Sequence, residues 1–180
     1  MSEITAFEAL RQLAERSQQV AVQLPAREHA QSRWQGLGFS LLGERFVVPL
    51  SEVSEIMRIP AQATRLPGVQ NFVMGVSNVR GRLLIVVDLA LFFGEPSSLP
   101  RGQRRILAIE NDENYLGFMV DESLGMQHFP SESYTTEPIP ELHDKIKGYI
   151  AGSYAVGGVN WPVMSLIALA NDPGLERFAA

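Results

Sequence analysis

The sequence predicts a mainly β protein made of two packed, five-stranded barrels, with short helices and one extra N-terminal helix. Short apolar runs of strand length recur along most of the 180 residues, separated by turns rich in Gly, Pro and Asn. This pattern is typical of small barrels. The second half of the chain repeats the order of elements found in the first half. No apolar run approaches the roughly 18 residues that a membrane span needs, so we expect no direct membrane insertion.

The first segment predicts a helix over residues 4–24. Thr5 and Glu8 have the spacing of a capping box, in which each side chain satisfies a backbone N–H near the other residue. Apolar residues then recur at helical spacing until Pro25, whose ring disfavours a helical conformation in the residue before it. We therefore expect residues 1–33 to form a helical extension. It either packs on its own domain or contacts a partner or a second copy.

From Trp34 onward the pattern changes to strands joined by turns. Two apolar runs flank Gly43-Glu44, as in a β-hairpin. Asp88 follows a later strand, and its carboxylate can cap a short helix there. The elements predicted in the first half are a hairpin over residues 37–50, an apolar stretch over 53–59, strands over 72–76 and 83–87, and a helix over 89–93.

The second half repeats this plan. Ile59-Pro60 and Phe129-Pro130 lie 70 residues apart, and Asp88-Leu89 and Ser165-Leu166 lie 77 apart. Such an offset indicates one supersecondary block used twice, and we predict two SH3-like barrels. The elements predicted here are a hairpin over residues 106–120, a stretch closing at Pro130, a polar loop over 131–147, a hairpin over 148–163 with a Gly157-Gly158 turn, and a helix over 166–170 capped by Ser165. We expect one domain over residues 34–175 and a tail over 176–180.

Composition and motifs argue against several functional classes. The net charge of −5 and the pI of about 5.2 disfavour non-specific binding to nucleic acid or anionic lipid. The chain has no cysteine, and His29, His128 and His143 lack the close spacing of metal ligands. It has no Gly-x-Ser-x-Gly elbow, phosphate loop or dinucleotide fingerprint. We therefore expect no enzyme activity, no cofactor and no metal site.

The carboxylates give no clear sign of acid–base chemistry. Glu52 and Glu55 are three residues apart, and Asp121 precedes Glu122. A general acid–base pair needs a cleft and shifted pKa values, which the sequence does not indicate. We interpret these residues as solvated charges at strand edges, where they oppose aggregation between sheets.

A polar turn stands out within the apolar stretch of residues 75–89. Asn78 can bond a nearby backbone amide, and Gly81 can supply a positive φ. Arg80 would then be held at a defined place between two strands. An arginine on a rigid turn is a good interface anchor, because its planar fork loses little freedom on binding. A solvated turn arginine without a partner is the alternative.

This segment resembles the signature of the CheW-like coupling family of chemosensory systems. The match is Gly75-Val-Ser-Asn-Val-Arg-Gly81, followed after one residue by an apolar strand and Asp88-Leu89. Other pieces agree with the family in order: the Gly-Glu turn of the first hairpin, Val53-Ser-Glu-Ile56, Leu116-Gly-Phe-Met-Val-Asp121 and Gly148-Tyr-Ile-Ala-Gly152. The similarity covers about residues 34–172. It implies a two-barrel fold without catalysis.

The resemblance also implies two kinds of partner in signal transduction. They are the cytoplasmic tip of a methyl-accepting chemoreceptor and the regulatory domain of a CheA-like histidine kinase. The positions that match the family's contact patterns are Val53, Glu55, Gly75, Asn78 and Arg80. Val53 and Gly75 also fit a purely packed role. We expect a cytoplasmic adaptor that its partners recruit to membrane receptor arrays. The extension with its Trp34-Gln35-Gly36 lead-in resembles coupling proteins of type IV pilus (twitching motility) systems.

Two functions from other classes stay open at this point. One is a small-molecule-binding or enzymatic barrel with residues 131–147 as its lid, which a ligand would stabilise by mass action. The other is a pilus-associated structural protein that self-associates through the N-terminal helix. The missing catalytic motifs disfavour the first, and removal of residues 1–33 would separate the second from a coupling role.

Overall fold

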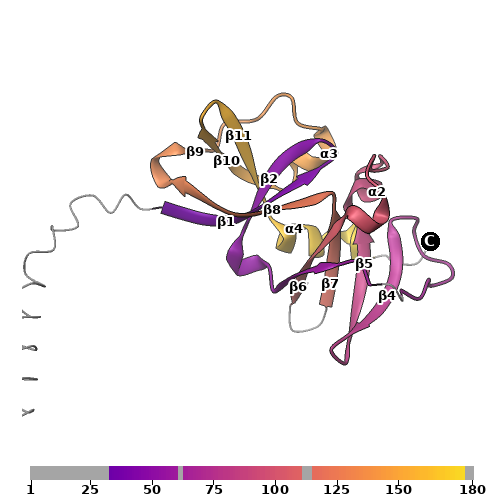
Figure 1. The fold of residues 1–180 in the computed structure, drawn as a ribbon. Coiled ribbons are helices and arrows are strands. Elements are labelled where there is room, and N and C mark those ends of the chain that lie inside the picture. Colours follow the sequence, from indigo (N-terminus) through magenta and orange to yellow (C-terminus); the bar gives the residue numbers. More distant parts are fainter. Residues whose placement is uncertain (1–32, 61–62, 111–114, 177–180) are drawn as a thin grey trace, which may run out of the picture. The chain divides into compact units, whose positions relative to one another are not determined.

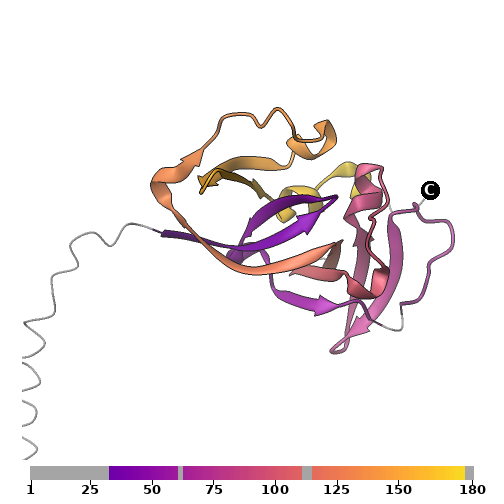
Figure 2. The same ribbon diagram turned by 45° about the horizontal axis from the view of Figure 1, so that its top comes forward.

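The computed structural model describes residues 33–60, 63–110 and 115–176, and these form two β-sheets with short helices (Figures 1 and 2). The mainly β class is therefore confirmed. One sheet has six strands in the order β8-β1-β2-β11-β10-β9, and the other has five in the order β3-β6-β7-β5-β4. The predicted helix of residues 4–24 lies outside the described residues, and the predicted domain limits stay predictions.

The elements have the following bounds. The six-stranded sheet contains β1 (Arg33–Leu41), β2 (Glu44–Pro49), β8 (Glu122–Pro130), β9 (Tyr134–Thr135), β10 (Ile150–Val156) and β11 (Val159–Met164). The five-stranded sheet contains β3 (Glu55–Arg58), β4 (Val73–Val79), β5 (Arg82–Asp88), β6 (Arg105–Glu110) and β7 (Tyr115–Val120). The helices are α2 (Leu89–Phe93), α3 (Asp144–Lys147), α4 (Leu166–Ala170) and α5 (Pro173–Glu176), with 3-10 turns η1 (Leu50–Glu52), η2 (Arg101–Gln103) and η3 (Ser131–Ser133).

The sheets do not correspond to successive halves of the chain, as a simple duplication would require. β1 and β2 join β8 to β11, while β3 to β7 form the other sheet. The chain passes between the sheets at η1 and again after β7. β2 and β11 pair in parallel, as do β5 and β7. The sixth strand, β9, is a two-residue edge strand, and its length explains why the sequence pattern did not reveal it.

The three predicted hairpins are confirmed by the antiparallel pairing of β1 with β2, β6 with β7 and β10 with β11. Among the described residues, two of these hairpins have two-residue turns, and so does β4–β5, which was predicted only as two strands around a turn. The turns are Leu42-Gly43, Arg80-Gly81 and Gly157-Gly158, and every residue in them has a positive φ. Positive φ at both positions is the type I′ pattern, whose twist matches that of paired strands. The first turn lies one residue earlier than predicted, because Glu44 already pairs with Leu41.

The main core unites the two sheets. It contains fully buried Phe39 and Phe46 from the six-stranded sheet, Phe118 from the five-stranded sheet and Phe93 from α2. The rings of Phe39 and Phe46 stack with centroids 5.5 Å apart. Full burial of one such side chain contributes about 1.5–3 kcal/mol. The two sheets are therefore parts of one packed unit.

The helix caps predicted at Asp88 and Ser165 are confirmed, whereas the Thr5–Glu8 capping box lies outside the described residues. The Asp88 carboxylate accepts hydrogen bonds from the N–H groups of Ala90 and Leu91 at 3.0 and 3.3 Å. The Ser165 hydroxyl oxygen accepts one from Ala168 N–H at 3.2 Å. The predicted loop over residues 131–147 is wrong in part, because η3, β9 and α3 lie within it. Elements of two to four residues are too short to produce a periodic pattern.

A buried charged cluster connects the sheets. Arg104 donates two hydrogen bonds to Asp88, at 2.7 and 2.9 Å, and its Nε lies 3.4 Å from Asp121 Oδ1. Asp121 Oδ2 in turn accepts a hydrogen bond from Leu42 N–H, in the β1–β2 turn, at 2.8 Å. The three charged residues are only 4–5% exposed. The interpretation of Asp121 as a solvated charge is therefore wrong.

The described residues contain neither a membrane-spanning helix nor a metal-binding group of side chains. None of the helices there is long and apolar enough to cross a lipid bilayer. No group of three or more His, Cys, Asp and Glu side chains in that part of the chain has the geometry to hold a metal ion.

Candidate functional site

The structure brings two of the predicted site residues into direct contact. Arg80 donates from its guanidinium to Glu55 Oε1 at 2.8 Å, across 25 residues of sequence. Arg80 lies in the turn of the β4–β5 hairpin, whose tip projects at the lower end of the view in Figure 1. Its side chain is 78% exposed, whereas that of Glu55, the first residue of β3, is 26% exposed. The Arg80 guanidinium is therefore exposed to solvent, while the Glu55 carboxylate that it bonds is half-buried.

Local chemistry fixes the Arg80 turn. Val79 and Arg82 close the hairpin, and Arg80 and Gly81 have φ values of 52° and 81°. Asn78 Oδ1 accepts a hydrogen bond from Gly81 N–H at 2.9 Å. The predicted roles of Asn78 and Gly81 in shaping this turn are thus confirmed. We call Glu55, Asn78, Arg80, Arg82 and Tyr115 the Arg80 surface.

Tyr115 belongs to this surface although the sequence gave no sign of it. Its hydroxyl lies 3.5 Å from Glu55 Oε2, and the Arg82 guanidinium lies 4.7 Å from the centroid of its ring. Burial first, and then the Glu55 carboxylate, raise the pKa of the Tyr115 hydroxyl above its usual 10, while Arg80 and Arg82 oppose the rise. Arg82 also pairs with Glu110. The surface therefore alternates positive and negative charge over a few side chains.

The other two predicted residues lie in different settings. Val53 follows η1, is half-buried and packs against the main core. Gly75 sits at a register shift in β4 with φ 130°, and a Cβ there would lie 2.3 Å from the Thr64 carbonyl oxygen. A close backbone approach at a strained φ is enough to require glycine. The backbone geometry alone therefore explains why glycine occupies position 75, whether or not Gly75 contacts a partner in a complex.

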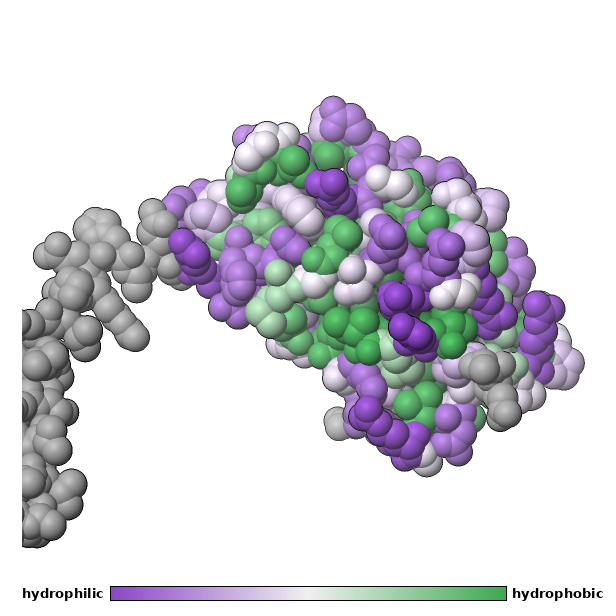
Figure 3. Space-filling view, viewed as in Figure 1, coloured by the Kyte–Doolittle hydropathy of each residue, from purple (hydrophilic) through white to green (hydrophobic). Residues whose placement is uncertain are grey.

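Apolar side chains are exposed on the strands that carry the Arg80 surface. Leu83, in β5, is 61% exposed, and Ile56, in β3, is 44% exposed. On the face seen in Figure 3, apolar side chains gather in several small patches separated by polar ones. Protein interfaces commonly combine exposed apolar side chains with a polar rim.

Glu52 is a further residue that sequence reasoning misjudged. Its carboxylate accepts hydrogen bonds from Leu166 N–H and Ile167 N–H at the start of α4, at 2.6 and 3.1 Å, and from the Ser165 hydroxyl at 3.2 Å. The interpretation of Glu52 as a solvated strand-edge charge is wrong. No sequence signal could have found this contact, because 114 residues separate Glu52 from Leu166.

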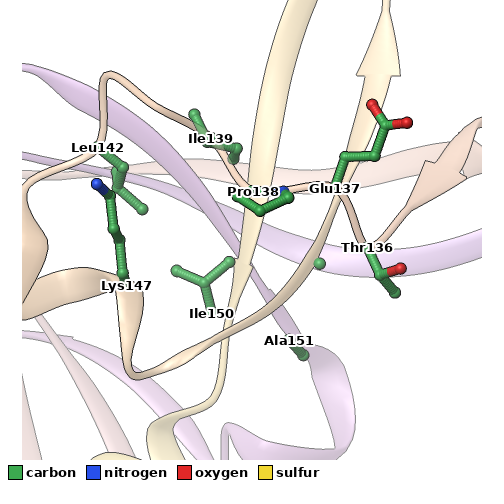
Figure 4. A pocket seen from close by; sticks show the side chains of 9 residues that line it. Thr136, Glu137, Pro138, Ile139, Leu142, Lys147, Ile150 and Ala151 are labelled. Carbon is green, nitrogen blue, oxygen red and sulfur yellow. The ribbon is translucent and has the colours of Figure 1, made fainter.

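A small pocket lies where a ligand-binding barrel with a lid over residues 131–147 would need one. It has a volume of about 230 Å³ and lies between that segment and β10 (Figure 4). Ligand pockets are usually about 300–1,000 Å³. The lining is largely apolar, with Ile139, Leu142 and Ile150, and the Lys147 ammonium is paired with Asp144 at 2.8 Å. Because the pocket is small and its lining is largely apolar, it gives no support to a ligand-binding or catalytic barrel.

Comparisons with known proteins identify relatives of the chain. A family model described as CheW-like domain matches residues 35–173. The chain is 41% identical to Protein PilI of Pseudomonas aeruginosa, over 97% of each chain. It is 28% identical to Chemotaxis protein CheW of Helicobacter pylori, over 59% of this chain and 63% of that protein. The crystal structure of the scaffolding protein TtCheW from Thermoanaerobacter tengcongensis has the same fold, with a TM-score of 0.67 and 21% identity over 83% of this chain and 95% of that one.

Proposed function

We propose, since the chain belongs to the CheW-like family, that it couples chemoreceptors to a CheA-like histidine kinase in a system controlling type IV pilus twitching motility. The family match over residues 35–173 makes it a non-catalytic coupling protein of chemosensory signalling. The assignment to pili is supported by 41% identity to PilI over nearly the whole chain. The two kinds of partner are those that the family resemblance implies, and the residues that match the family's contact patterns support them.

The geometry of Arg80 carries the proposal. An exposed ion pair such as Arg80–Glu55 contributes only about 0–1 kcal/mol to folding, so folding alone gives little reason to place an arginine there. Only one guanidinium nitrogen bonds Glu55, and the fork has five N–H donors. The remaining donors can bind partner carboxylates or carbonyls. Leu83 and Ile56 are also exposed on these strands, but they directly follow Arg82 and Glu55 and so point to the opposite face of the sheet.

Coupling by this route needs no chemistry in the chain itself. If the receptor, the adaptor and the kinase form one complex, a change of receptor state shifts the kinase equilibrium by the difference in binding free energy between the kinase states. The adaptor must therefore hold both partners in a fixed geometry. A single packed unit with its binding turn fixed by Asn78 and Gly81 meets that requirement.

A binding experiment with charge-reversed variants tests the proposal. Wild type, Arg80→Asp and Arg101→Asp are each incubated with a CheA-like regulatory domain and with a chemoreceptor cytoplasmic tip. Arg101 is an exposed arginine in η2, so it controls for the change of charge. We expect Arg80→Asp to weaken binding to at least one partner and to keep its circular-dichroism melt. Wild-type protein that binds neither partner would refute the coupling role.

The output is tested separately in a bacterium that carries the gene. Deletion of the gene is expected to abolish twitching and to leave flagellar swimming unchanged. Under the coupling role, a chain lacking residues 1–33 should still bind the kinase domain, because the proposed contact residues lie between Val53 and Arg80. Loss of swimming with intact twitching would contradict the assignment to pili while leaving the coupling role in place.

A further inference from the structure

Glu52 lies where the chain first crosses from the six-stranded to the five-stranded sheet. The crossing consists of Leu50 to Val53, between the end of β2 and Ser54. Inside it, Val53 N–H donates to the Leu50 carbonyl at 3.3 Å, which is long for a backbone hydrogen bond. The turn itself therefore does little to hold Val53 in place.

The two ends of the crossing are fixed by contacts elsewhere. At one end, Ser54 N–H and the Ser54 hydroxyl both donate to the Ala108 carbonyl in β6, at 2.8 and 2.9 Å. At the other end, the Glu52 carboxylate receives the two α4 N–H groups and the Ser165 hydroxyl. Val53 lies between these two anchors, and Glu55 begins the strand directly after them.

The Glu52 anchor is strong for its size. Hydrogen bonds to an ionised acceptor are about twice as strong as neutral ones, and Glu52 is only half exposed to solvent screening. Ser165 also caps α4 through Ala168 N–H. One carboxylate on the crossing and one hydroxyl on α4 thus share the free N–H groups at the start of the same helix.

We propose that Glu52 is a positioning residue, which fixes Val53 and the start of β3 against α4 and so sets the orientation of the Arg80 surface toward a partner. The inference rests on the proposed coupling function. Glu52 itself touches no partner in this scheme. It acts through the crossing segment, because the contacts of Glu52 and of Ser54 together leave Val53 little freedom to move.

Hydrogen exchange tests the positioning without any partner. Glu52→Ala removes the acceptor, whereas Glu52→Gln keeps a carbonyl oxygen for the two α4 N–H groups and an amide that can donate to Ser165. We expect amides of residues 53–55 to exchange about tenfold faster in Glu52→Ala, since local opening reports on such anchors. In Glu52→Gln they should exchange at a rate between those of wild type and Glu52→Ala, because the neutral amide keeps the acceptor but forms weaker hydrogen bonds than the carboxylate. Equal exchange in wild type and Glu52→Ala would overturn the inference.

Binding in two backgrounds separates positioning from general destabilisation. Affinity for the CheA-like regulatory domain is measured for Glu52→Ala alone and combined with Arg80→Asp. We expect a loss of about tenfold in the wild-type background and little further loss in the Arg80→Asp background, because contacting or coupled residues are non-additive. Equal losses in both backgrounds, or none in either, would overturn the inference. If wild type binds no partner, the coupling role fails, and the exchange result alone decides whether Glu52 orders the crossing.

Discussion

Replacing Arg104 with methionine should destabilise the protein more than any surface change of the same kind. Methionine keeps the length and the apolar stem of the side chain and removes the guanidinium. The change leaves Asp88 and Asp121 without their cation, although both side chains are at most 7% exposed. Two carboxylates would then repel each other where water cannot screen them.

The magnitude follows from the burial of the cluster. Breaking a buried ion pair by removing one partner costs about 3–5 kcal/mol. The free energy of unfolding of such domains is about 5–15 kcal/mol, so the variant should still fold but lose a large part of its stability. With an m-value of about 2 kcal/mol per M in urea, the unfolding midpoint should fall by about 2 M.

Urea unfolding of matched variants measures the effect. Far-ultraviolet circular dichroism follows both sheets, and the fluorescence of Trp34 and Trp161 follows the six-stranded sheet. Arg80→Met is the control, because Arg80 also pairs with a carboxylate at 2.8 Å but is 78% exposed. An exposed pair of this kind contributes about 0–1 kcal/mol. If Arg104→Met loses no more stability than Arg80→Met, the reasoning from burial is wrong.

Two smaller predictions concern single residues. Gly75→Ala should lose about 1–3 kcal/mol in urea unfolding, because φ is 130° and its Cβ would meet Thr64; Gly68→Ala, with open space around it, should lose less. Burial first, and then its hydrogen bond to Asp172, raise the pKa of Tyr149 to about 12. The stability this gives is present below pH 10 and lost between pH 10 and 12. Tyr149→Phe should therefore lack the last tyrosinate step seen at 295 nm.

Local patterns predicted much of the fold because their causes are local. The caps at Asp88 and Ser165 and the helices after them follow from hydrogen bonds that span two or three residues. The hairpins follow from period-two patterns and from glycine in the turns. Such rules link neighbours along the chain, so the sequence alone expresses them.

The same patterns could not predict which strands share a sheet. The pairing of β2 with β11 joins Val47 to Val163, and nothing near either valine selects the other. The contacts of Glu52 with α4 and of Tyr115 with Glu55 likewise join residues far apart in the sequence, and no local pattern marks either of them. The site was therefore predictable only at Asn78, Arg80 and Gly81, where a local turn shapes it, together with residues marked by family resemblance.

Arg80 and Leu42 occupy equivalent turn positions for different reasons, and this difference predicts opposite effects of the same substitution. Both have a positive φ, 52° and 54°, before a glycine. An ordinary L-residue pays roughly 1–2 kcal/mol for this conformation, which asparagine adopts more readily. Leu42 packs against the main core in return. Among the described residues, the hydrogen bond that Arg80 makes in return is its exposed contact with Glu55.

Arg80→Asn should therefore raise the stability of the isolated protein by up to about 1 kcal/mol while it weakens binding to the kinase domain or the receptor tip. Leu42→Asn should lower stability, since it loses apolar packing. Urea unfolding and a binding titration on the same preparations measure both effects. If Arg80→Asn is less stable than wild type by more than about 1 kcal/mol, Arg80 is a structural residue. If it binds both partners as tightly as wild type, the unfavourable turn residue has no role in coupling.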